Sequence, residues 1–439
     1  MPTPRIDPDR REKASAVPRV NPHDLRPGQA IATLSAVTLP DGVGASLSIE
    51  QGLIAAAPSA SAPVAAASDE VEVDATGWLL LPPAADLHAH IDKAYTWSAA
   101  GEPEGSLEDA VACWRAFGAA VTEERIALNA RRQLDAALRA GVTAVRTHVN
   151  YHEGGDPLRG IRAVIEARED YRGLVDVQVV AMHDQFRDTG MIRDAIALGV
   201  DLIGAAPHLS TDPRDEIDRA VAIAEDAGIG IDLHTDETLN PESLDLLHLA
   251  RRTADWPDEM TRSAGHCVSL AVQPPDRLAA VLAAAAEARV SIITNPLTNL
   301  YLQGWEHPVA TPRAVPPLAA ILDAGVVLAA GGDNVQDPFN PLGNGDMVDV
   351  AAALVLAGHL SPRRAWQVVA RGRELLGLGA ANAAAGDDAD LVLVRAASVA
   401  EALAERAPDR VVVRGGRVVA TRRTASDVVA VPSRKEVAL

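Results

Sequence analysis

Short apolar runs alternate with amphipathic segments through most of the chain. Most of the runs are rich in Val, Ile and Leu, as in strands buried on both faces of a parallel sheet, while the segments between them repeat apolar residues at helical spacing. There are eight such runs, at residues 79–90, 142–149, 175–182, 202–208, 231–237, 261–266, 290–295 and 326–333. Eight strands joined by crossover helices predict an α/β fold of the (β/α)8 TIM-barrel type.

Helical patterns lie between or after these runs. The clearest cover residues 122–140, 214–227, 275–288 and 346–360. Gly141, Gly228 and Gly325 follow helical segments, and glycine is the residue that most easily adopts the left-handed conformation that ends a helix. We therefore expect ordered βα units rather than one continuous helical array.

Both ends of the chain carry β-like pieces instead. They lie at 30–37 and 45–54 near the start, and at 389–394 and 410–421, with a Gly415-Gly416 turn, near the end. We expect one small β subdomain built from both termini. The predicted division is 1–78 for a flexible N-terminus and the first part of this subdomain, 79–378 for the barrel, and 379–439 for the second part and a C-terminal tail.

Polar residues close most of the predicted barrel strands, and the active site of such a barrel lies at the C-terminal strand ends. His88 and His90 are two residues apart, so they point to the same side of their strand. Alone, this pair is equally consistent with two surface or core histidines. Reading the other run ends adds His148, Gln178, His208, His234 with Glu237, His266, Asn295 and Asp333.

Three imidazoles and one carboxylate from this set can hold a metal ion. His88, His90, His234 and Asp333 are ligands that Zn²⁺ or Fe²⁺ accepts, with room for a water molecule. The pKa of a water on such an ion falls to about 7, which makes it a nucleophile. We expect Asp333 to take its proton, Glu237 to carry a proton to the leaving group, and His266 to hydrogen-bond the hydroxide or the developing oxyanion. The alternative for Glu237 is a solvated loop acid.

The few lysines bear on the number of metal ions. Barrel hydrolases with two metals often bridge them through a carboxylated lysine on the fourth strand, but this chain has only Lys13, Lys93 and Lys435. None of these lies on the predicted fourth strand. The sequence therefore predicts one divalent ion, which disfavours ring opening of the hydantoinase or dihydroorotase type. Lys93, together with Asp92, is interpreted as an entrance ion pair or as solvated loop charge.

Composition limits the partners. The 439 residues carry a net charge of −20, and the isoelectric point is near 5.0. Nucleic acids and anionic membranes need a basic surface, so both are disfavoured and a small uncharged substrate is expected. Two cysteines fit a reducing compartment, and nowhere do about 18 uncharged apolar residues run together, which together predict a cytoplasmic protein. A homo-oligomer is expected because barrels of this sort often associate.

The run-end motifs resemble the bacterial cytosine deaminase branch of the amidohydrolase superfamily, from about residue 79 to the C-terminus. The motifs that carry the resemblance are His88-Ala-His90-Ile-Asp92, Arg146-Thr-His148-Val149, Asp176-Val-Gln178-Val-Val-Ala181, Gly204-Ala-Ala-Pro-His208, Asp232-Leu-His234-Thr-Asp-Glu237, Gly265-His266, Asn295-Pro-Leu-Thr-Asn-Leu-Tyr-Leu-Gln-Gly304 and Asp333-Asn-Val-Gln-Asp-Pro-Phe-Asn-Pro-Leu-Gly343. The resemblance implies hydrolytic deamination of a ring C–NH₂, with the same four metal ligands and with proton transfer by Glu237 and His266. It also implies that Gln178 pairs with the amide edge of the substrate ring. The alternative is that Gln178 is a satisfied amide inside the barrel.

Departures from that branch leave the substrate open. Asn334 stands where cytosine deaminase has a second acid, and Phe339 stands where it has a tryptophan. Asn334 and the Lys93 continuation look more like relatives that act on aminotriazines, whereas the His234-x-x-Glu237 pair is missing from the dealkylating relatives. We therefore expect ammonia release from cytosine, isocytosine or an aminotriazine. The alternatives are hydrolysis of an N-alkylamino-triazine or a cyclic amide, or a catalytically silent barrel used for binding.

Two smaller sets of residues complete the predicted pocket. Trp97 and Phe339, with Tyr301 and Trp305, could stack on a flat ring, or could pack in the core. His148 and His208 either line the pocket or are hydrogen-bonded structural histidines. Asn334 is included among the residues expected to touch the substrate.

Overall fold

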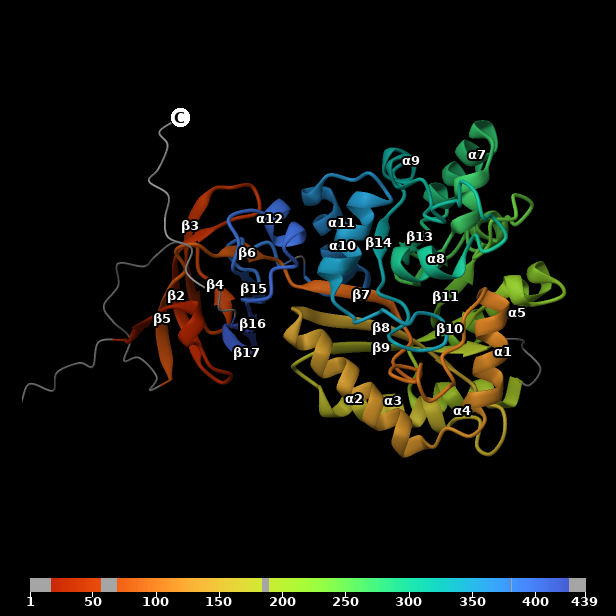
Figure 1. The fold of residues 1–439 in the computed structure, drawn as a ribbon, viewed down its shortest axis with the longest axis horizontal. Coiled ribbons are helices and arrows are strands. Elements are labelled where there is room, and N and C mark those ends of the chain that lie inside the picture. Colours follow the sequence, from red (N-terminus) through yellow and green to blue (C-terminus); the bar gives the residue numbers. More distant parts are fainter. Residues whose placement is uncertain (1–16, 57–68, 184–188, 380, 426–439) are drawn as a thin grey trace, which may run out of the picture.

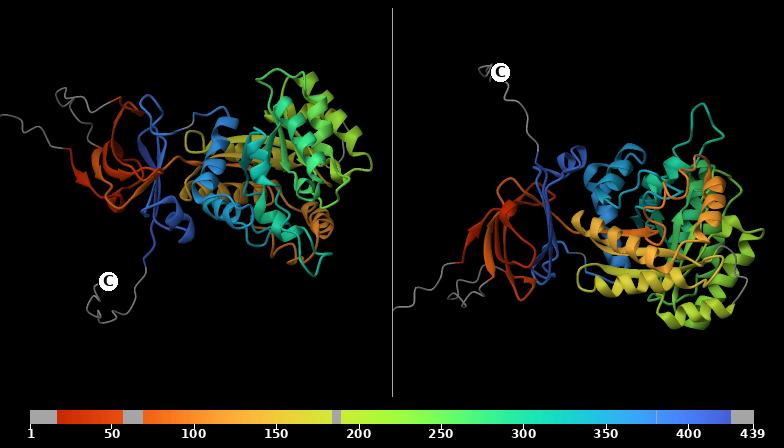
Figure 2. Two further views of the ribbon diagram at one scale, coloured as in Figure 1. Left: turned by 90° about the horizontal axis from the view of Figure 1, so that it is seen from above. Right: turned by 60° about the horizontal axis from the view of Figure 1, so that its bottom comes forward.

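A computed structural model describes residues 17–56, 69–183, 189–379 and 381–425. It shows two lobes side by side, a larger α/β lobe and a smaller β lobe (Figures 1 and 2). The flexible start and the C-terminal tail predicted from the sequence fall largely outside the described ranges. In the part of the chain that is described, none of the helices combines the length and apolarity needed to cross a bilayer.

The larger lobe is built on an eight-stranded parallel sheet. Its strands follow chain order: β7 (Ala84–Ala89), β8 (Val142–Asn150), β9 (Asp176–His183), β10 (Leu202–Ala205), β11 (Gly230–Thr235), β12 (Arg262–His266), β13 (Ser291–Thr294) and β14 (Leu328–Ala330). A parallel bridge between Ala89 and Asp333 joins the two ends of the sheet. The predicted (β/α)8 barrel is confirmed.

The helices surround this sheet, as Figure 1 shows. They are α1 (Leu107–Gly118), α2 (Glu123–Arg139), α3 (Arg159–Asp170), α4 (Thr189–Leu198), α5 (Pro213–Ala227), α6 (Asp245–Arg252), α7 (Pro275–Glu287), α8 (Pro296–Leu302), α9 (Leu318–Asp323), α10 (Met347–Leu356) and α11 (Pro362–Leu375). The Thr122 side chain caps the start of α2, and Gly228, with φ of +66°, ends α5 as the sequence predicts. Their apolar faces pack on the strands in one core that runs through the lobe.

The smaller lobe is a nine-stranded sheet made from both ends of the chain. Its strands are β1 (Arg19–Val20), β2 (Ala30–Thr38), β3 (Gly44–Glu50), β4 (Leu53–Ile54), β5 (Glu70–Asp74), β6 (Leu79–Leu81), β15 (Leu391–Val394), β16 (Arg410–Arg414) and β17 (Arg417–Arg422). The helix α12 (Val399–Ala404) lies between β15 and β16 in the chain. The sheet has its own apolar core, so the predicted β subdomain from both termini is confirmed.

The first predicted barrel strand is divided into two. Residues 79–90 were expected to form one strand, but β6 pairs with β15 and β2 in the small lobe, and β7 pairs with β8 in the barrel. Pro82 and Pro83 separate the two strands, and proline has no backbone N–H to donate to a sheet. The chain therefore crosses from one lobe to the other at these two prolines.

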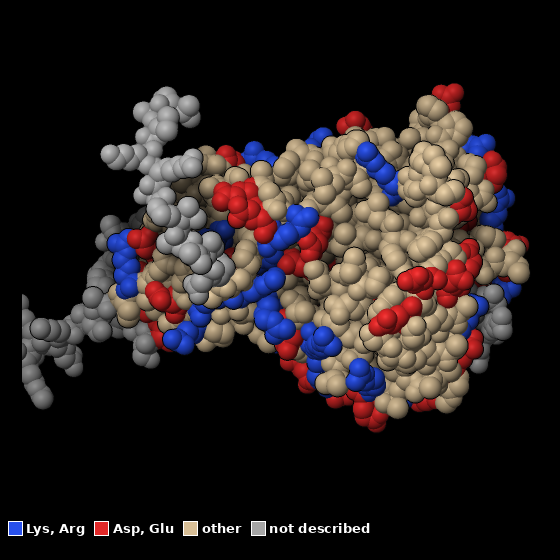
Figure 3. Space-filling model, viewed as in Figure 1, with Lys and Arg blue, Asp and Glu red and all other residues tan. Residues whose placement is uncertain are grey.

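Charged side chains of both signs are spread over the surface. On the face drawn in Figure 3, blue Lys and Arg side chains stand among red Asp and Glu side chains over both lobes. Many of them form exposed ion pairs, such as Arg219 with Asp215 at 2.7 Å. Such exposed pairs contribute about 0–1 kcal/mol each, so the buried strands and their cores decide the fold.

Candidate active site

Three imidazoles converge at the C-terminal ends of β7 and β11. Nε2 of His234 lies 3.0 Å from Nε2 of His88 and 3.2 Å from Nε2 of His90. Oδ1 of Asp333 lies 3.4 Å from Nε2 of His90 and 3.9 Å from Nε2 of His88. Metal–nitrogen bonds of about 2.0–2.1 Å place neighbouring tetrahedral ligand atoms about 3.3 Å apart, so these distances fit a single ion.

The protonation of these groups also suits a cation. Burial lowers the pKa of His88, His90 and His234 well below the ordinary value, so the rings are neutral, as metal ligands must be. Nδ1 of His90 is 3.2 Å from the carbonyl oxygen of His148, and donation to that oxygen leaves Nε2 free for a metal. Both side-chain oxygens of Asp333 are buried, and no group among the described residues hydrogen-bonds to either of them. A buried carboxylate in this state lacks the cation that would compensate its burial.

The backbone around the four predicted ligands is arranged to bring them together. The Asp333 N–H donates to the carbonyl oxygen of His88 at 2.6 Å. Asp86 accepts hydrogen bonds from the N–H groups of Gly332, at 2.8 Å, and His88, at 3.3 Å. These bonds connect the segment that carries His88 to the segment that carries Asp333. A Cβ on Gly265 would lie 2.8 Å from the His88 ring, so only glycine leaves room for that ring.

His266 and Glu237 lie beside the imidazole cluster. Nδ1 of His266 is 2.8 Å from Oδ1 of Asn299, so the ring donates there and its Nε2 faces Asp333 Oδ2 at 4.0 Å. Burial lowers the pKa of His266 to about 3, which leaves the ring neutral with an acceptor at Nε2. Oε1 of Glu237 is 3.5 Å from Nδ1 of His266, and Oε2 is 3.5 Å from Nε2 of His208. Burial raises the pKa of Glu237 to about 8, so this side chain can hold a proton at neutral pH.

Two of these residues have a left-handed backbone. His266 and Asp333 have φ of +66° and +63°, and Asp236, next to Glu237, has φ of +54°. Such angles are uncommon for residues other than glycine and cost of order 1–3 kcal/mol each. The chain keeps this conformation at the ends of β11, β12 and β14, the strands that lead to these residues.

A pocket opens directly above the cluster. Its lining comes from strand ends and from α1: His90, Lys93, Leu107, Val111, Trp114, Arg115, Asn150, Met182, Ala206, His208, Leu209, His234, Glu237, His266, Asp333, Asn334 and Phe339. The structure thus brings Glu237, His266, Asp333, Asn334 and Phe339 to one pocket. Nδ2 of Asn334 donates to Oδ2 of Asp337 at 2.7 Å, so its carbonyl oxygen is the group left for other contacts.

Two predicted substrate contacts are not brought to this pocket. Oε1 of Gln178 accepts from Nε of Arg146 at 2.7 Å, and Arg146 also binds Asp232 at 2.7 Å. In the sheet, Gln178 is paired with Arg146, which lies two residues before His148 on β8. Gln178 therefore belongs to a polar layer deeper in the barrel. Trp97 packs edge-on against Tyr301, with ring centres 6.4 Å apart. Neither Gln178 nor Trp97 is among the described residues that line the pocket.

The two open histidines take different positions. His208 lines the pocket next to Glu237. The His148 ring packs against that of His88 with centres 4.1 Å apart, and its Nε2 lies 3.3 Å from Oδ1 of Asp232. His148 therefore supports His88 from below, while His208 faces the space where a substrate would lie.

Lys93 differs from its predicted interpretation. It was expected to be an entrance ion pair or a solvated loop charge, but it is only 3% exposed and lines the pocket. Asp92 is fully buried, and its Oδ2 accepts from the Asn150 N–H at 3.2 Å. The neighbours Ile91 and Ala94 are apolar and buried, so this part of the chain lies inside the protein. These apolar residues could have indicated from the sequence that Lys93 is buried, but the interpretation of Lys93 did not use them. The lining contributed by α1, including Trp114, was also missed, because α1 precedes the second strand and ends no predicted run.

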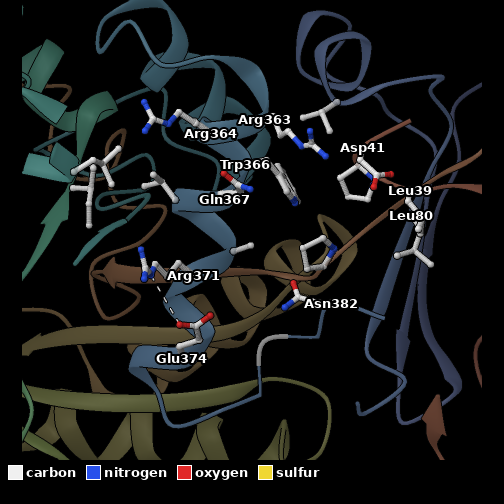
Figure 4. Close-up of a pocket in the computed structure, with 17 residues that line it drawn as sticks. Leu39, Asp41, Leu80, Arg363, Arg364, Trp366, Gln367, Arg371, Glu374 and Asn382 are labelled. Atoms are coloured by element: carbon white, nitrogen blue, oxygen red, sulfur yellow. Dashed lines mark ion pairs between the residues drawn. The ribbon is translucent and has the colours of Figure 1, made fainter. Parts of the chain in front are cut away.

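A second cavity of about 550 Å³ lies between the lobes and contains none of these groups. Figure 4 shows Arg363, Trp366 and Arg371 of α11 on one side, with Asp41 and Leu80 of the small lobe on the other. Its lining has no histidine or cysteine, and its Glu374 is within 3.9 Å of Arg371. Although this cavity is larger, the chemistry of the histidine cluster identifies the other pocket as the candidate active site.

Comparison with known proteins agrees with this fold. Residues 98–420 match the Amidohydrolase family. A pterin deaminase from Rhizobium rhizogenes (strain K84 / ATCC BAA-868) is 31% identical over 412 residues, which cover 88% of this chain and 92% of that protein. The chain belongs to the amidohydrolase family, and the predicted superfamily is confirmed.

Two further similarities are informative. The N-isopropylammelide isopropyl amidohydrolase of Pseudomonas sp. (strain ADP) is 24% identical over 370 residues, covering 79% of this chain and 87% of that protein. The crystal structure of 5-methylcytosine deaminase from Klebsiella pneumoniae with 5-fluorocytosine matches with a TM-score of 0.77 and 23% identity, covering 91% of this chain and 99% of the other. At this identity the second similarity supports the barrel fold alone.

Proposed function

We propose that the protein is a metal-dependent hydrolytic deaminase that releases ammonia from an amino-substituted N-heterocycle. The observation that carries the proposal is the convergence of His88, His90 and His234 on a buried Asp333 whose two side-chain oxygens have no partner. One divalent ion, Zn²⁺ or Fe²⁺, suits three imidazoles and one carboxylate. When bound, it would supply a water molecule of lowered pKa.

The chain's own residues supply the proton transfers. Asp333 can accept a proton from the attacking water on the oxygen that a metal leaves free. His266, with its acceptor Nε2 toward Asp333, orients the water. Glu237 holds a proton near neutral pH and can give it to the amino nitrogen. The C–N bond then breaks and ammonia leaves. The remaining hydroxyl proton passes to the ring nitrogen, so the ring carbon keeps the water's oxygen as a carbonyl, and the proton on Asp333 restores the acid form of Glu237.

We propose a pterin-type ring, with isocytosine as its smaller counterpart, as the preferred substrate. The pocket shares Leu107, His208, Leu209 and Glu237 with a wider groove of about 890 Å³. A bicyclic ring that carries a substituent could place its amino end at Glu237 and extend the substituent into this groove. The 31% identity to a pterin deaminase supports this substrate class over cytosine or aminotriazines.

The alternative function is hydrolysis of an N-alkylamino substituent. The observation that favours it is the similarity to an N-isopropylammelide isopropyl amidohydrolase. The two reactions share the water-activating site and differ only in the leaving amine. The His234-x-x-Glu237 pair, which the dealkylating relatives lack, favours deamination.

Product analysis tests the proposal. Protein loaded with Zn²⁺ or Fe²⁺ would be incubated with pterin, isocytosine, cytosine, ammelide, creatinine and N-isopropylammelide, and ammonia and alkylamine would be measured separately. Ammonia from pterin and isocytosine is the expected result. Alkylamine without ammonia would establish the alternative, and no turnover of any amino-heterocycle would refute both. A cytoplasmic location and a homo-oligomeric state remain predictions for fractionation and light scattering.

A further inference from the structure

Lys93 places a positive charge in the wall of the catalytic pocket. It follows β7 by four residues and is held in the bend by its own backbone, since its N–H donates to the His90 carbonyl at 3.1 Å and its carbonyl accepts from Thr96 Oγ1 at 2.6 Å. The residue is 3% exposed and shares the pocket with His234, Glu237 and Asp333. The side chain therefore ends where the substrate ring would lie.

The ammonium is surrounded by aromatic faces. Nζ lies 4.7 Å from the centre of the Phe339 ring and 5.6 Å from the centre of the Trp114 ring. These faces attract a cation but offer no lone pairs to its three N–H donors. Cation–π contact thus holds Nζ in position without satisfying its hydrogen-bonding capacity.

Within the described ranges, no ion pair or hydrogen bond of Lys93 Nζ with a protein group is present. Two of the nearby acids, Asp337 and Asp92, accept hydrogen bonds from other groups. Asp337 accepts from Asn334 Nδ2 at 2.7 Å and from the Phe339 N–H at 2.9 Å, and Asp92 accepts from Asn150. Asp333 is one of the proposed metal ligands. An ammonium in the pocket wall with no protein acceptor has three unused N–H donors, so its position favours an acceptor that enters with the substrate.

We propose that Lys93 binds the ring carbonyl oxygen of the substrate, and thereby selects amino-heterocycles in which the ring nitrogen next to the amino carbon is bonded to a carbonyl carbon. This rests on the proposed function and names the feature of the ring that the site reads. Isocytosine and pterin share this 2-amino-4-oxo arrangement. Lys93 takes over the recognition that the sequence resemblance implied for Gln178, whose amide is bound to Arg146.

The charge of Lys93 matters during the reaction as well as for binding. When water adds to the amino carbon, the electron pair of the C=N bond moves onto the ring nitrogen and, through conjugation, onto the carbonyl oxygen. An ammonium at that oxygen stabilises the charge that develops there. When the C–N bond to the amine breaks, the hydroxyl proton moves to the ring nitrogen, whose electron pair then forms the N–H bond. The substrate's own carbonyl oxygen remains a carbonyl, and Lys93 is unchanged. Its loss should therefore reduce kcat as well as raise KM.

The first experiment compares Lys93→Met with the wild-type enzyme, since methionine keeps a similar length without the charge. We expect kcat/KM for isocytosine and pterin to fall about 10- to 100-fold, the range for a hydrogen bond to a charged group. Lys93→Arg should recover part of the loss. Arg132→Met is the matched control, because Arg132 also lies over an aromatic ring, 3.6 Å from the centre of Tyr95, but lines no described part of the pocket.

The second experiment measures recognition without turnover. Pteridin-4-one and pteridine, which lack the amino group, would be compared as competitive inhibitors. The wild type should bind the oxo compound at least about 10-fold more tightly, and Lys93→Met should remove that preference. An unchanged ratio of the two inhibition constants in Lys93→Met overturns the proposal. An equal loss of affinity for both inhibitors, accompanied by lower metal content or a lower melting temperature, also overturns it. If the wild type deaminates no heterocycle, the proposed function itself has failed, whatever Lys93 binds.

Discussion

Oε1 of Glu237 lies 3.5 Å from Nδ1 of His266. The two side chains come from neighbouring strands, β11 and β12, and both are almost fully buried. One is a carboxyl whose pKa is raised to about 8 by burial, and the other is an imidazole whose pKa is lowered to about 3 by burial. At neutral pH the pair therefore consists of a protonated acid, which can give its proton to the leaving amine, and a neutral ring whose acceptor Nε2 faces Asp333.

Replacing Glu237 by glutamine should remove the proton carrier and leave the pocket intact. We expect kcat for deamination to fall about 10²- to 10⁴-fold with little change in metal content. Steady-state kinetics and elemental analysis measure the two quantities. Glu287→Gln, an exposed acid at the end of α7, is the control that should keep full activity. Near-normal turnover by Glu237→Gln would show that another group delivers the proton.

The raised pKa of Glu237 also predicts a pH profile. Since the acid form is the proton donor, kcat/KM should fall as the pH rises through about 8, by about tenfold per unit beyond it. The falling limb should disappear in Glu237→Gln, because the glutamine amide has no proton to lose in this pH range. The low residual rate of the variant should therefore not fall as the pH rises through about 8. A basic limb that persists in the variant would belong to a different group.

Asp333→Asn should abolish both metal retention and proton acceptance. The substituted side chain would offer a neutral amide where the structure has two unpartnered carboxylate oxygens, so we expect the bound metal to fall and kcat to drop about 10³-fold or more. Elemental analysis of the wild type should give one ion per chain, and a chelator should inactivate it reversibly. Asp323→Asn, on the exposed face of α9, is the matched control. Two equivalents of metal per chain would contradict the mononuclear prediction.

The fold could be predicted in detail because its signals are local. Strand and helix periodicity located all eight barrel strands, and the caps of α2 and α5 lie at Thr122 and Gly228 as their residue types indicate. The division at Pro82-Pro83 was missed because an apolar run gives no sign of which sheet each half joins. That choice depends on pairing with β15, more than 300 residues away in the chain.

The site could be predicted only in part, for a related reason. Metal ligands sit at strand ends, and the order of strands in a barrel brings those ends together. Whether a residue near the end of a strand reaches the pocket also depends on the register of that strand with its neighbours, which the sequence pattern does not give. Gln178 and His148 both belong to predicted strands, yet the register pairs Gln178 with Arg146, below the level of the histidines. Lys93 lies outside any run, and its burial depends on α1 closing over the pocket with Trp114.

Asp245, in the groove beside the site, predicts a pH dependence of stability. Burial and the nearby Asp236 raise the pKa of Asp245 to about 7, and within the part of the chain that the structure describes its Oδ2 has no hydrogen-bond partner. The folded state therefore binds this proton more tightly than the unfolded state, so the free energy of unfolding falls as the pH rises from about 4 to 7. Asp245→Asn should be more stable than the wild type at pH 8, by up to about 4 kcal/mol, and should show no such gain at pH 4. Denaturant unfolding at both pH values measures this, with Asp255→Asn as an exposed control.

Gln178→Met separates a structural amide from one that reads the substrate. In the structure Oε1 of Gln178 accepts from Nε of Arg146, whose Nη1 binds Asp232, and Asp232 in turn faces His148. Removing the amide leaves a buried guanidinium N–H without an acceptor, so we expect a loss of about 1–3 kcal/mol in unfolding free energy. KM for isocytosine and pterin should stay within about twofold, since Gln178 does not reach the pocket, and Gln367→Met on the exposed side of α11 should change neither quantity. A KM that rises more than tenfold with stability unchanged would instead assign substrate recognition to Gln178, as its resemblance to the cytosine deaminase glutamine implies.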